Sequence, residues 1–208
     1  MSLLSTTTLK VDYLTGLSAS DSVTEATLGR EVTRAEAVAA RELGYPGTVP
    51  TLASGSYVLR LAASRLSTDR LALPVAPVTA IASVYQDTDQ VFGASTEVVS
   101  TDYERVDYPT GSLLILLPSS VASSWYTGER EIKATVTAGY ANEAAMPADL
   151  ADAIYLLAAS RWTRRNTREI LNKSADSQSE SFRDFAAIPK EVADIFARYA
   201  LMGTVGAS

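Results

Sequence analysis

Two stretches with helical periodicity flank a long run of short β-type segments, and this order constrains the fold more than any other feature of the chain. Apolar residues at spacings of three and four predict a first helix over residues 22–43. Its predicted buried face consists of Leu28, Val32, Ala35, Ala39 and Leu43. Similar patterns predict a helix over residues 147–171 and a last helix that begins at Pro189.

The first predicted helix carries signals at both of its ends. Ser22 begins a capping-box pattern, and Gly44 is typical of a helix stop. Gly29 lies inside the helix, where a glycine costs roughly 1 kcal/mol relative to alanine. A second capping-box pattern begins at Thr33, so a break near Gly29 remains an alternative to one continuous helix.

Residues 56–137 consist of short runs of β-branched, aromatic and aliphatic residues separated by turn residues. The predicted strands cover residues 57–61, 71–74, 78–85, 103–106, 113–117 and 132–136. Alternation in the third run predicts that Val78, Ala80, Ala82 and Val84 share one face. Several short strands joined by short turns predict an antiparallel sheet or a small barrel.

These elements predict an α+β fold in which a small antiparallel β-sheet or barrel-like lobe is inserted into a helical bundle lobe. We expect five parts along the chain. They are an N-terminal arm or extended strand (1–21), the first helix with its connection (22–55), the β lobe (56–140), the C-terminal helices with a polar loop at 172–186 (141–200), and a flexible C-terminal tail (201–208).

The chain contains no cysteine and no histidine. The absence of cysteine excludes disulfides and thiol chemistry, and the absence of histidine removes the commonest general base and metal ligand. The glycines form no phosphate-binding or dinucleotide-binding motif. We therefore predict no catalytic residues, no cofactor-binding residues, no metal ligands and no enzymatic activity.

The net charge of −6 argues against tight nucleic-acid binding, which depends on Lys and Arg contacts to phosphates. The first nine residues lack the features of a signal peptide. The longest apolar stretch, residues 153–159, is too short to cross a bilayer. We therefore expect a soluble protein that is made in the cytoplasm and does not bind membranes.

Two groups of acidic residues are candidates for metal or acid/base sites. Asp149 and Asp152, with Glu143 nearby, are better explained as complements to the positive end of a helix. Asp87 and Asp89 resemble half of a calcium loop, but a hairpin turn is the preferred interpretation because the remaining ligands do not follow.

The run Arg161-Trp162-Thr163-Arg164-Arg165 mixes basic and aromatic residues, as a nucleic-acid patch would. Cations are also favoured at the C-terminal end of any helix. We therefore prefer a helix-end cation cluster, or a salt-bridge face between subunits, with Trp162 in the core.

Several segments occur in the order and spacing found in the phage head-tail connector (adaptor) family. Residues 73–85 are similar to the family's "LPxxPVxxVxSVx" segment, and residues 111–114 to its "GxLxL" strand. Further similar segments are 132–140, 147–150, 161–165, 179–185 and 188–199. The chain thus resembles, over roughly residues 22–200, the connectors of long-tailed double-stranded DNA phages and gene transfer agents.

The resemblance implies a structural virion protein at the junction of capsid and tail. Such adaptors form a homo-oligomeric ring, usually dodecameric, under the portal protein. They extend a channel through which double-stranded DNA passes without sequence-specific binding, and they dock the stopper or tail. The C-terminal segment commonly reaches into the portal, so the expected partner contacts are Phe196, Tyr199, Leu201, Met202 and Val205.

Two other functions stay open. The chain could be a stopper or tail-completion protein of the same assembly, which would bind the tail tube. It could also be a carbohydrate-binding β module or a hydrolase, in which exposed aromatic residues form ligand platforms. Trp125 and the tyrosines are scattered through the β region, which favours core and interface packing.

Overall fold

A computed structural model describes residues 2–14, 22–48, 50–171 and 188–201. Within this part the chain divides into two compact units. The helical unit comprises Met1–Leu43, Val49–Leu52 and Asn142–Arg198, and the β unit comprises Gly44–Thr48, Ala53–Ala141 and Tyr199–Ser208. The predicted α+β fold, with a β lobe inserted between helical segments, is confirmed.

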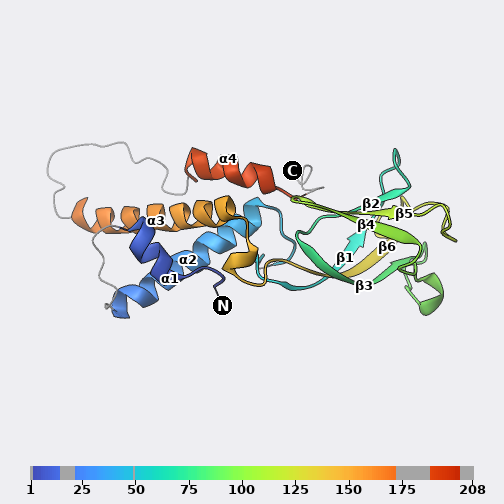
Figure 1. Cartoon of the computed structure of the whole chain (residues 1–208), viewed down its shortest axis with the longest axis horizontal. Helices are drawn as coiled ribbons and strands as arrows, with labels where there is room; N and C mark the ends of the chain where they lie inside the picture. Colours follow the sequence, from blue (N-terminus) through green and yellow to red (C-terminus); the bar gives the residue numbers. More distant parts are fainter. Residues whose placement is uncertain (1, 15–21, 49, 172–187, 202–208) are drawn as a thin grey trace. The chain divides into compact units, whose positions relative to one another are not determined.

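Two long helices that pack against each other form the centre of the helical unit (Figure 1). They are α2 (Ser22–Glu42) and α3 (Ala148–Leu171). All five residues of the predicted α2 face are buried, and α2 runs through Gly29 without a break. Gly44 follows with a φ of 84°, the left-handed conformation that ends many helices.

The N-terminal segment is helical, so the prediction of an arm or extended strand is wrong for the part described. It consists of α1 (Thr6–Thr8) and a π-helical turn, η1 (Leu9–Tyr13). The turn η1 contacts α3 and the helix α1 contacts α2, and Leu9 is completely buried. Its Ser- and Thr-rich sequence has low helix propensity, so tertiary packing and the capping of two backbone N–H groups by the Ser5 hydroxyl decide the conformation.

The last helix, α4 (Lys190–Tyr199), has one apolar side. Val192 and Phe196 are buried, whereas Ile195 and Tyr199 are half-buried. Within the described part of the chain, none of the helices is both long and apolar enough to span a membrane.

The β unit contains two three-stranded antiparallel sheets rather than a single sheet. The first has the order β1 (Gly55–Leu61), β6 (Ile132–Ala138), β3 (Val78–Gln86), and the second has the order β2 (Arg70–Leu73), β5 (Gly111–Leu116), β4 (Tyr103–Tyr108). Side chains from both sheets form one core with Trp125, whose indole N–H donates to the Leu114 carbonyl at 3.2 Å.

The predicted face of the 78–85 strand is only half correct. Val78 and Val84 are buried, but Ala80 and Ala82 are exposed, and Ile81 packs against the core instead. The pairing of β3 with β6 shifts register twice, between Val78 and Ala80 and between Ile81 and Ser83. Each shift adds a residue on β3, which turns the following side chains to the opposite face.

Candidate functional site

The acidic residues near the start of α3 are engaged in contacts within the helical unit. Asp149 forms an ion pair with Arg198 at 3.1 Å, and Asp152 accepts a hydrogen bond from the Tyr13 hydroxyl. Glu143 accepts from the Tyr155 hydroxyl at 2.8 Å. The described residues contain no group of three side chains arranged to hold a metal ion. These three carboxylates thus bind side chains of the same unit, which is a structural role in addition to the predicted complement to the helix end.

Tyr13 and Tyr155 stack with ring centroids 5.0 Å apart and join the N-terminal segment to α3. The Tyr155 hydroxyl also accepts from the Ser5 backbone N–H at 2.9 Å. Burial, followed by the hydrogen bond to Glu143, raises the pKa of Tyr155 to about 12. Both hydroxyls stay protonated at neutral pH, so they serve as hydrogen-bond donors and not as general bases.

The 87–93 segment contains a turn, as predicted, and the Asp87 carboxylate organises it. The strands before and after it, β3 and β4, belong to different sheets, so they do not form a two-stranded hairpin. The Asp87 carboxylate accepts from the backbone N–H groups of Asp89, Val91 and Phe92 at 2.9 to 3.1 Å. These bonds hold the pKa of Asp87 below its usual value, and the bond from the Phe92 N–H has the largest effect. Because the carboxylate already binds these donors, a cation site is not needed to explain this acidic segment.

Aromatic residues of the β unit mainly serve packing. Trp125 is buried and lies 6.1 Å from Tyr103 between ring centroids. Tyr45 is buried and its hydroxyl donates to the Ala76 carbonyl. Tyr108 and Tyr126 are exposed, at 45% and 37%, so the carbohydrate-platform alternative would have to rest on these two side chains.

The basic run on α3 is only partly described. Arg161, Trp162 and Arg164 are half-buried and Thr163 is exposed, while the Arg165 side chain lies outside the described residues. Trp162 is thus less buried than predicted. It follows the buried part of α3, which contains Leu150, Ile154 and Leu157.

The five expected partner-contact residues fall into three groups. Phe196 and Leu201 are buried, and Tyr199 is half-buried. Met202 and Val205 lie outside the described residues. Contact with a partner therefore remains a prediction for all five, and for Phe196 and Leu201 it requires that their present packing be opened.

Three long connections gather at one end of the β unit. Residues 62–69, 87–102 and 117–131 each join one sheet to the other, and strand pairing places their ends together, with Leu61 and Gln86 both opposite Ile132. The last connection, 117–131, is hydrogen-bonded to both others. The Trp125 N–H donates to the Thr68 carbonyl at 2.7 Å, and the Leu117 N–H to the Asp102 carbonyl at 2.9 Å.

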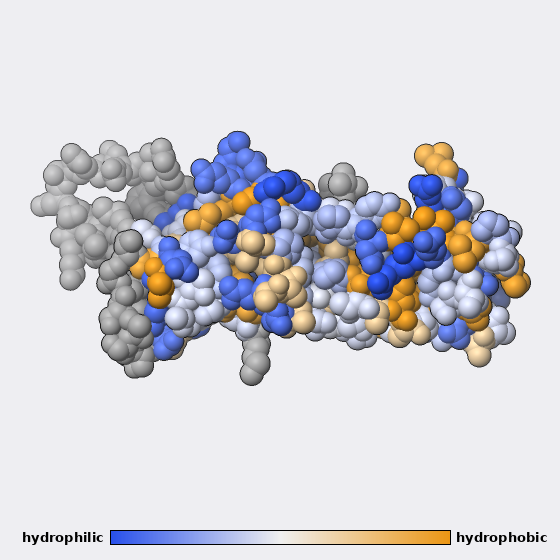
Figure 2. Space-filling model, in the orientation of Figure 1, coloured by the Kyte–Doolittle hydropathy of each residue, from blue (hydrophilic) through white to orange (hydrophobic). Residues whose placement is uncertain are grey.

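Each of these connections exposes a large aliphatic side chain. Leu66 is 98% exposed, Val91 79% and Val121 95%. Figure 2 shows apolar surface on the projecting connections at this end of the β unit. Sequence reasoning missed this feature, although Leu66 and Val121 are aliphatic residues amid serines in turn-rich stretches. Single exposed aliphatic residues are common on protein surfaces, and three at the same end of one unit form a candidate for a surface that another protein covers.

The comparisons with known proteins give matches among solved structures alone. No protein-family model matches the chain, and neither does any curated protein. A chain from the neck of an empty gene transfer agent particle, computed with sixfold symmetry, matches 98% of this chain and 92% of its own length, with a TM-score of 0.60 and 21% identity.

Two further structures agree with this match. A chain of the virion of a native gene transfer agent particle has the same coverages and TM-score, with 23% identity. A chain from the neck of a native particle, computed with twelvefold symmetry, covers 87% of this chain and 85% of its own length, with a TM-score of 0.54 and 24% identity. The present chain therefore shares its fold with chains of these particles over nearly its full length.

Proposed function

We propose that this protein is a structural component of a phage-type neck, and specifically the head-to-tail adaptor. In this role, copies form a homo-oligomeric ring under the portal protein, extend the DNA channel and dock the stopper or tail. The observation that carries the proposal is the full-length fold match to chains of gene transfer agent necks and virions. The motif resemblance over residues 22–200 independently supports a neck protein, and within the neck it favours the adaptor.

The surface chemistry supports an assembly role. A ring requires two different faces per subunit and a further surface for the next component of the neck. The exposed aliphatic residues Leu66, Val91 and Val121 supply an apolar surface of the latter kind. The twelvefold and sixfold symmetries of the related necks are both compatible with twelve copies, so we propose a dodecamer.

We also propose which partners the ring contacts and where it lies in the particle. The C-terminal segment, including Met202 and Val205, is proposed to reach the portal. DNA would pass through the lumen without sequence-specific binding, in keeping with the net charge of −6, and the ring would lie at the capsid-tail junction after assembly in the host cytoplasm.

Capture on purified portal and on purified tail tube, followed by imaging of the captured species, tests the proposal. An adaptor should bind to the portal and form a ring there, and in the absence of portal it should not bind the tail tube. Retention by the tube alone would favour the stopper alternative. A chain that lacks residues 202–208 tests the proposed portal contact of the C-terminal segment, and it should bind portal less tightly than the full chain. This truncation keeps the buried Leu201 and should therefore leave the fold intact.

A further inference from the structure

The two open sides of the β unit differ in charge. In each sheet the two edge strands flank a central strand, β1 and β3 on either side of β6 and β2 and β4 on either side of β5. Residues 62–69 join the edge strands β1 and β2 directly. On the opposite edge, the segment that leads into β4 lies beside β3, where the Val98 N–H donates to the Val84 carbonyl at 2.8 Å. We call residues 55–73 the arginine side and residues 97–108 the acidic side. The arginine side has three arginines and one aspartate, whereas the acidic side has four acidic residues and one arginine.

The charges on the arginine side are available to a partner. Arg60, Arg65 and Arg70 are exposed. Arg65 forms no ion pair with any residue that the structure describes, and Arg70 has a solvent-exposed pair with Asp69 at 3.5 Å. Arg60 lies 4.2 Å from the centre of the Phe92 ring, a contact that leaves its charge in place.

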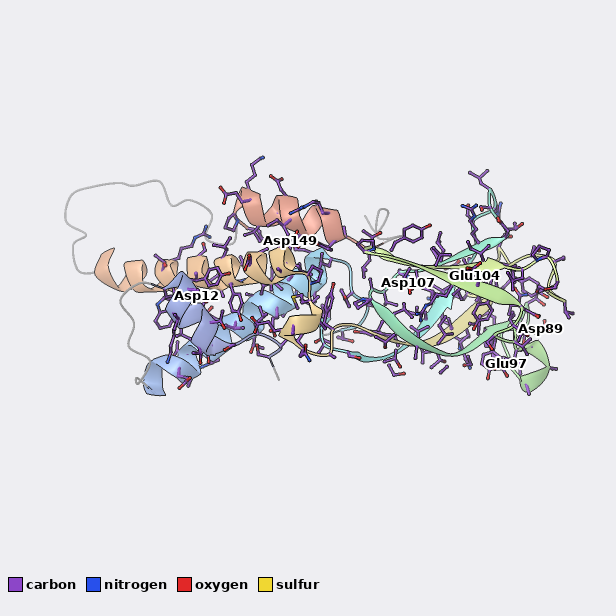
Figure 3. The ribbon with its side chains drawn as sticks, in the orientation of Figure 1. Asp12, Asp89, Glu97, Glu104, Asp107 and Asp149 are labelled. Atoms are coloured by element: carbon purple, nitrogen blue, oxygen red, sulfur yellow. The ribbon has the colours of Figure 1, made fainter. Side chains whose placement is uncertain are left out.

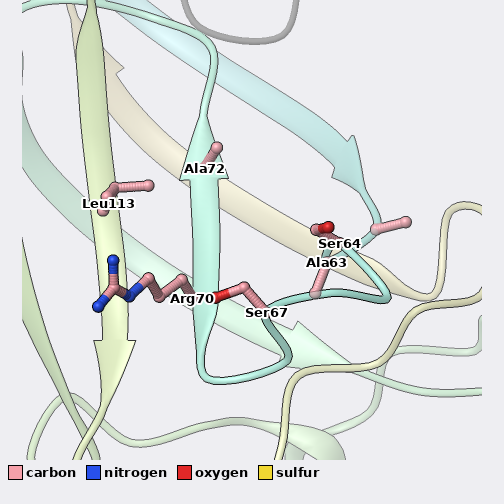
Figure 4. A pocket seen from close by; sticks show the side chains of 7 residues that line it. Ala63, Ser64, Ser67, Arg70, Ala72 and Leu113 are labelled. Carbon is pink, nitrogen blue, oxygen red and sulfur yellow. The ribbon is translucent and has the colours of Figure 1, made fainter.

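The arginine side also contains a hollow. Its volume is about 500 Å³, and its walls include Ala63, Ser64, Ala72 and Leu113. Figure 4 shows it between the end of β1 and strands β2 and β5, with the Arg70 side chain at its edge. Small side chains beside a guanidinium leave room for an acidic side chain from outside.

The acidic side carries the opposite charge and can therefore pair with the arginine side. Glu97 and Glu104 are exposed and Asp102 is half-exposed, and within the described ranges none of the three has an ion-pair partner. Asp107 alone is paired, with Arg105 at 3.1 Å. Figure 3 shows Glu104 and Asp107 along β4 and Glu97 on the connection that precedes it.

These charges discriminate between two kinds of association. A two-fold dimer through either side would place like charges opposite each other, which is unfavourable. A head-to-tail arrangement places the arginine side of one copy against the acidic side of the next, and this is the kind of contact that a closed ring requires. Charged edge strands would also deter unspecific edge-to-edge pairing, but that purpose does not require opposite signs on the two sides.

We propose that adjacent subunits associate through their β units in this way, with the arginine side of one copy docked on the acidic side of a second copy. The inference rests on the proposed ring and adds the surfaces that form it. Because the charges are exposed, we expect the contact to weaken as salt rises, since the Debye length falls from about 10 Å at 0.1 M to about 3 Å at 1 M.

Charge reversal on each side tests the inference. One variant carries Arg65→Glu and Arg70→Glu, and the other carries Glu97→Lys and Glu104→Lys. Each variant alone should form rings at least about tenfold less readily than the wild type, because like charges then meet at every contact. The mass by light scattering and electron microscope images, with and without portal, measure assembly, and thermal unfolding of each subunit checks its fold.

Restoration is the decisive result. A mixture of the two variants should form rings in which they alternate, and a chain carrying all four substitutions, which has the wild-type net charge, should also assemble. If single-side variants assemble as the wild type does, or if neither combination restores rings, the inference is overturned while the ring itself stands. A wild type that never assembles, even with portal, contradicts the proposed function and this inference together.

Discussion

Glu36 ties the N-terminal segment to α2. One oxygen of its carboxylate accepts hydrogen bonds from the Ser2 hydroxyl and from the backbone N–H groups of Leu3 and Leu4, each at 2.8 Å. The side chain is largely buried, and charge-assisted bonds of this kind are stronger than neutral ones. Sequence analysis treated this segment as an arm because the distant glutamate cannot be recognised as its partner before the fold is known.

Glu36→Ala should therefore destabilise the helical unit. We expect a loss of about 1–3 kcal/mol in the free energy of unfolding, since buried backbone donors lose their acceptor. Urea denaturation followed by circular dichroism measures the change. Glu42→Ala, at an exposed position on the same helix, is the matched control. Equal stability of the two variants would contradict the anchoring role of Glu36.

Asp87 should make stability depend on pH. Its carboxylate has a lowered pKa because backbone N–H groups bind the charged form. The stabilisation is therefore fully present above the usual pKa of 3.8 and is lost as the pH falls through the lowered value. Asp87→Ala should lower the melting temperature at neutral pH, and the difference from wild type should shrink below that usual pKa.

Melting temperatures measured from neutral to strongly acidic pH check this prediction. Asp89→Ala is the control, because Asp89 lies in the same turn and its exposed carboxylate binds none of the described residues. A constant difference between Asp87→Ala and wild type over the whole pH range would contradict the role assigned to the charged form.

At the scale of elements, periodicity predicted well wherever one face of an element is buried throughout. The α2 face and the six strands follow from their patterns, because burial selects apolar residues at the period of the backbone. The face of β3 could not be predicted, since two register shifts produce a mixed order that no simple period describes. The division into two sheets was also missed, because strand partners far apart in sequence leave no local signal.

Gly29 offers a test of α2 as an element. A methyl group added there would lie 3.6 Å from the Thr6 methyl carbon, an ordinary van der Waals distance, and the helix is continuous at this point. Gly29→Ala should therefore stabilise the protein by about 0.5–1 kcal/mol in urea denaturation, because alanine loses less backbone entropy on folding.

The reverse substitution at an exposed position of the same helix, Ala26→Gly, should cost a similar amount. A loss of stability in Gly29→Ala would show that α1 and α2 need a closer approach than the structure gives them.

At the scale of the whole molecule, we propose that the chain acts through contact with other proteins. Its two units carry no histidine or cysteine, its described carboxylates at the start of α3 serve packing, and its β unit exposes aliphatic loop residues and oppositely charged sides. The absence of common chemical groups and the family resemblance were visible in the sequence. The loop surface and the charged sides were not, because both depend on which distant segments the sheets bring together.

The mass of the protein in solution, measured by light scattering with and without purified portal and followed by imaging, tests the central claim most directly. The account predicts closed rings on the portal, with twelve copies in each. A protein that remains a single copy in the presence of portal, or that binds elsewhere than the portal vertex, would contradict it.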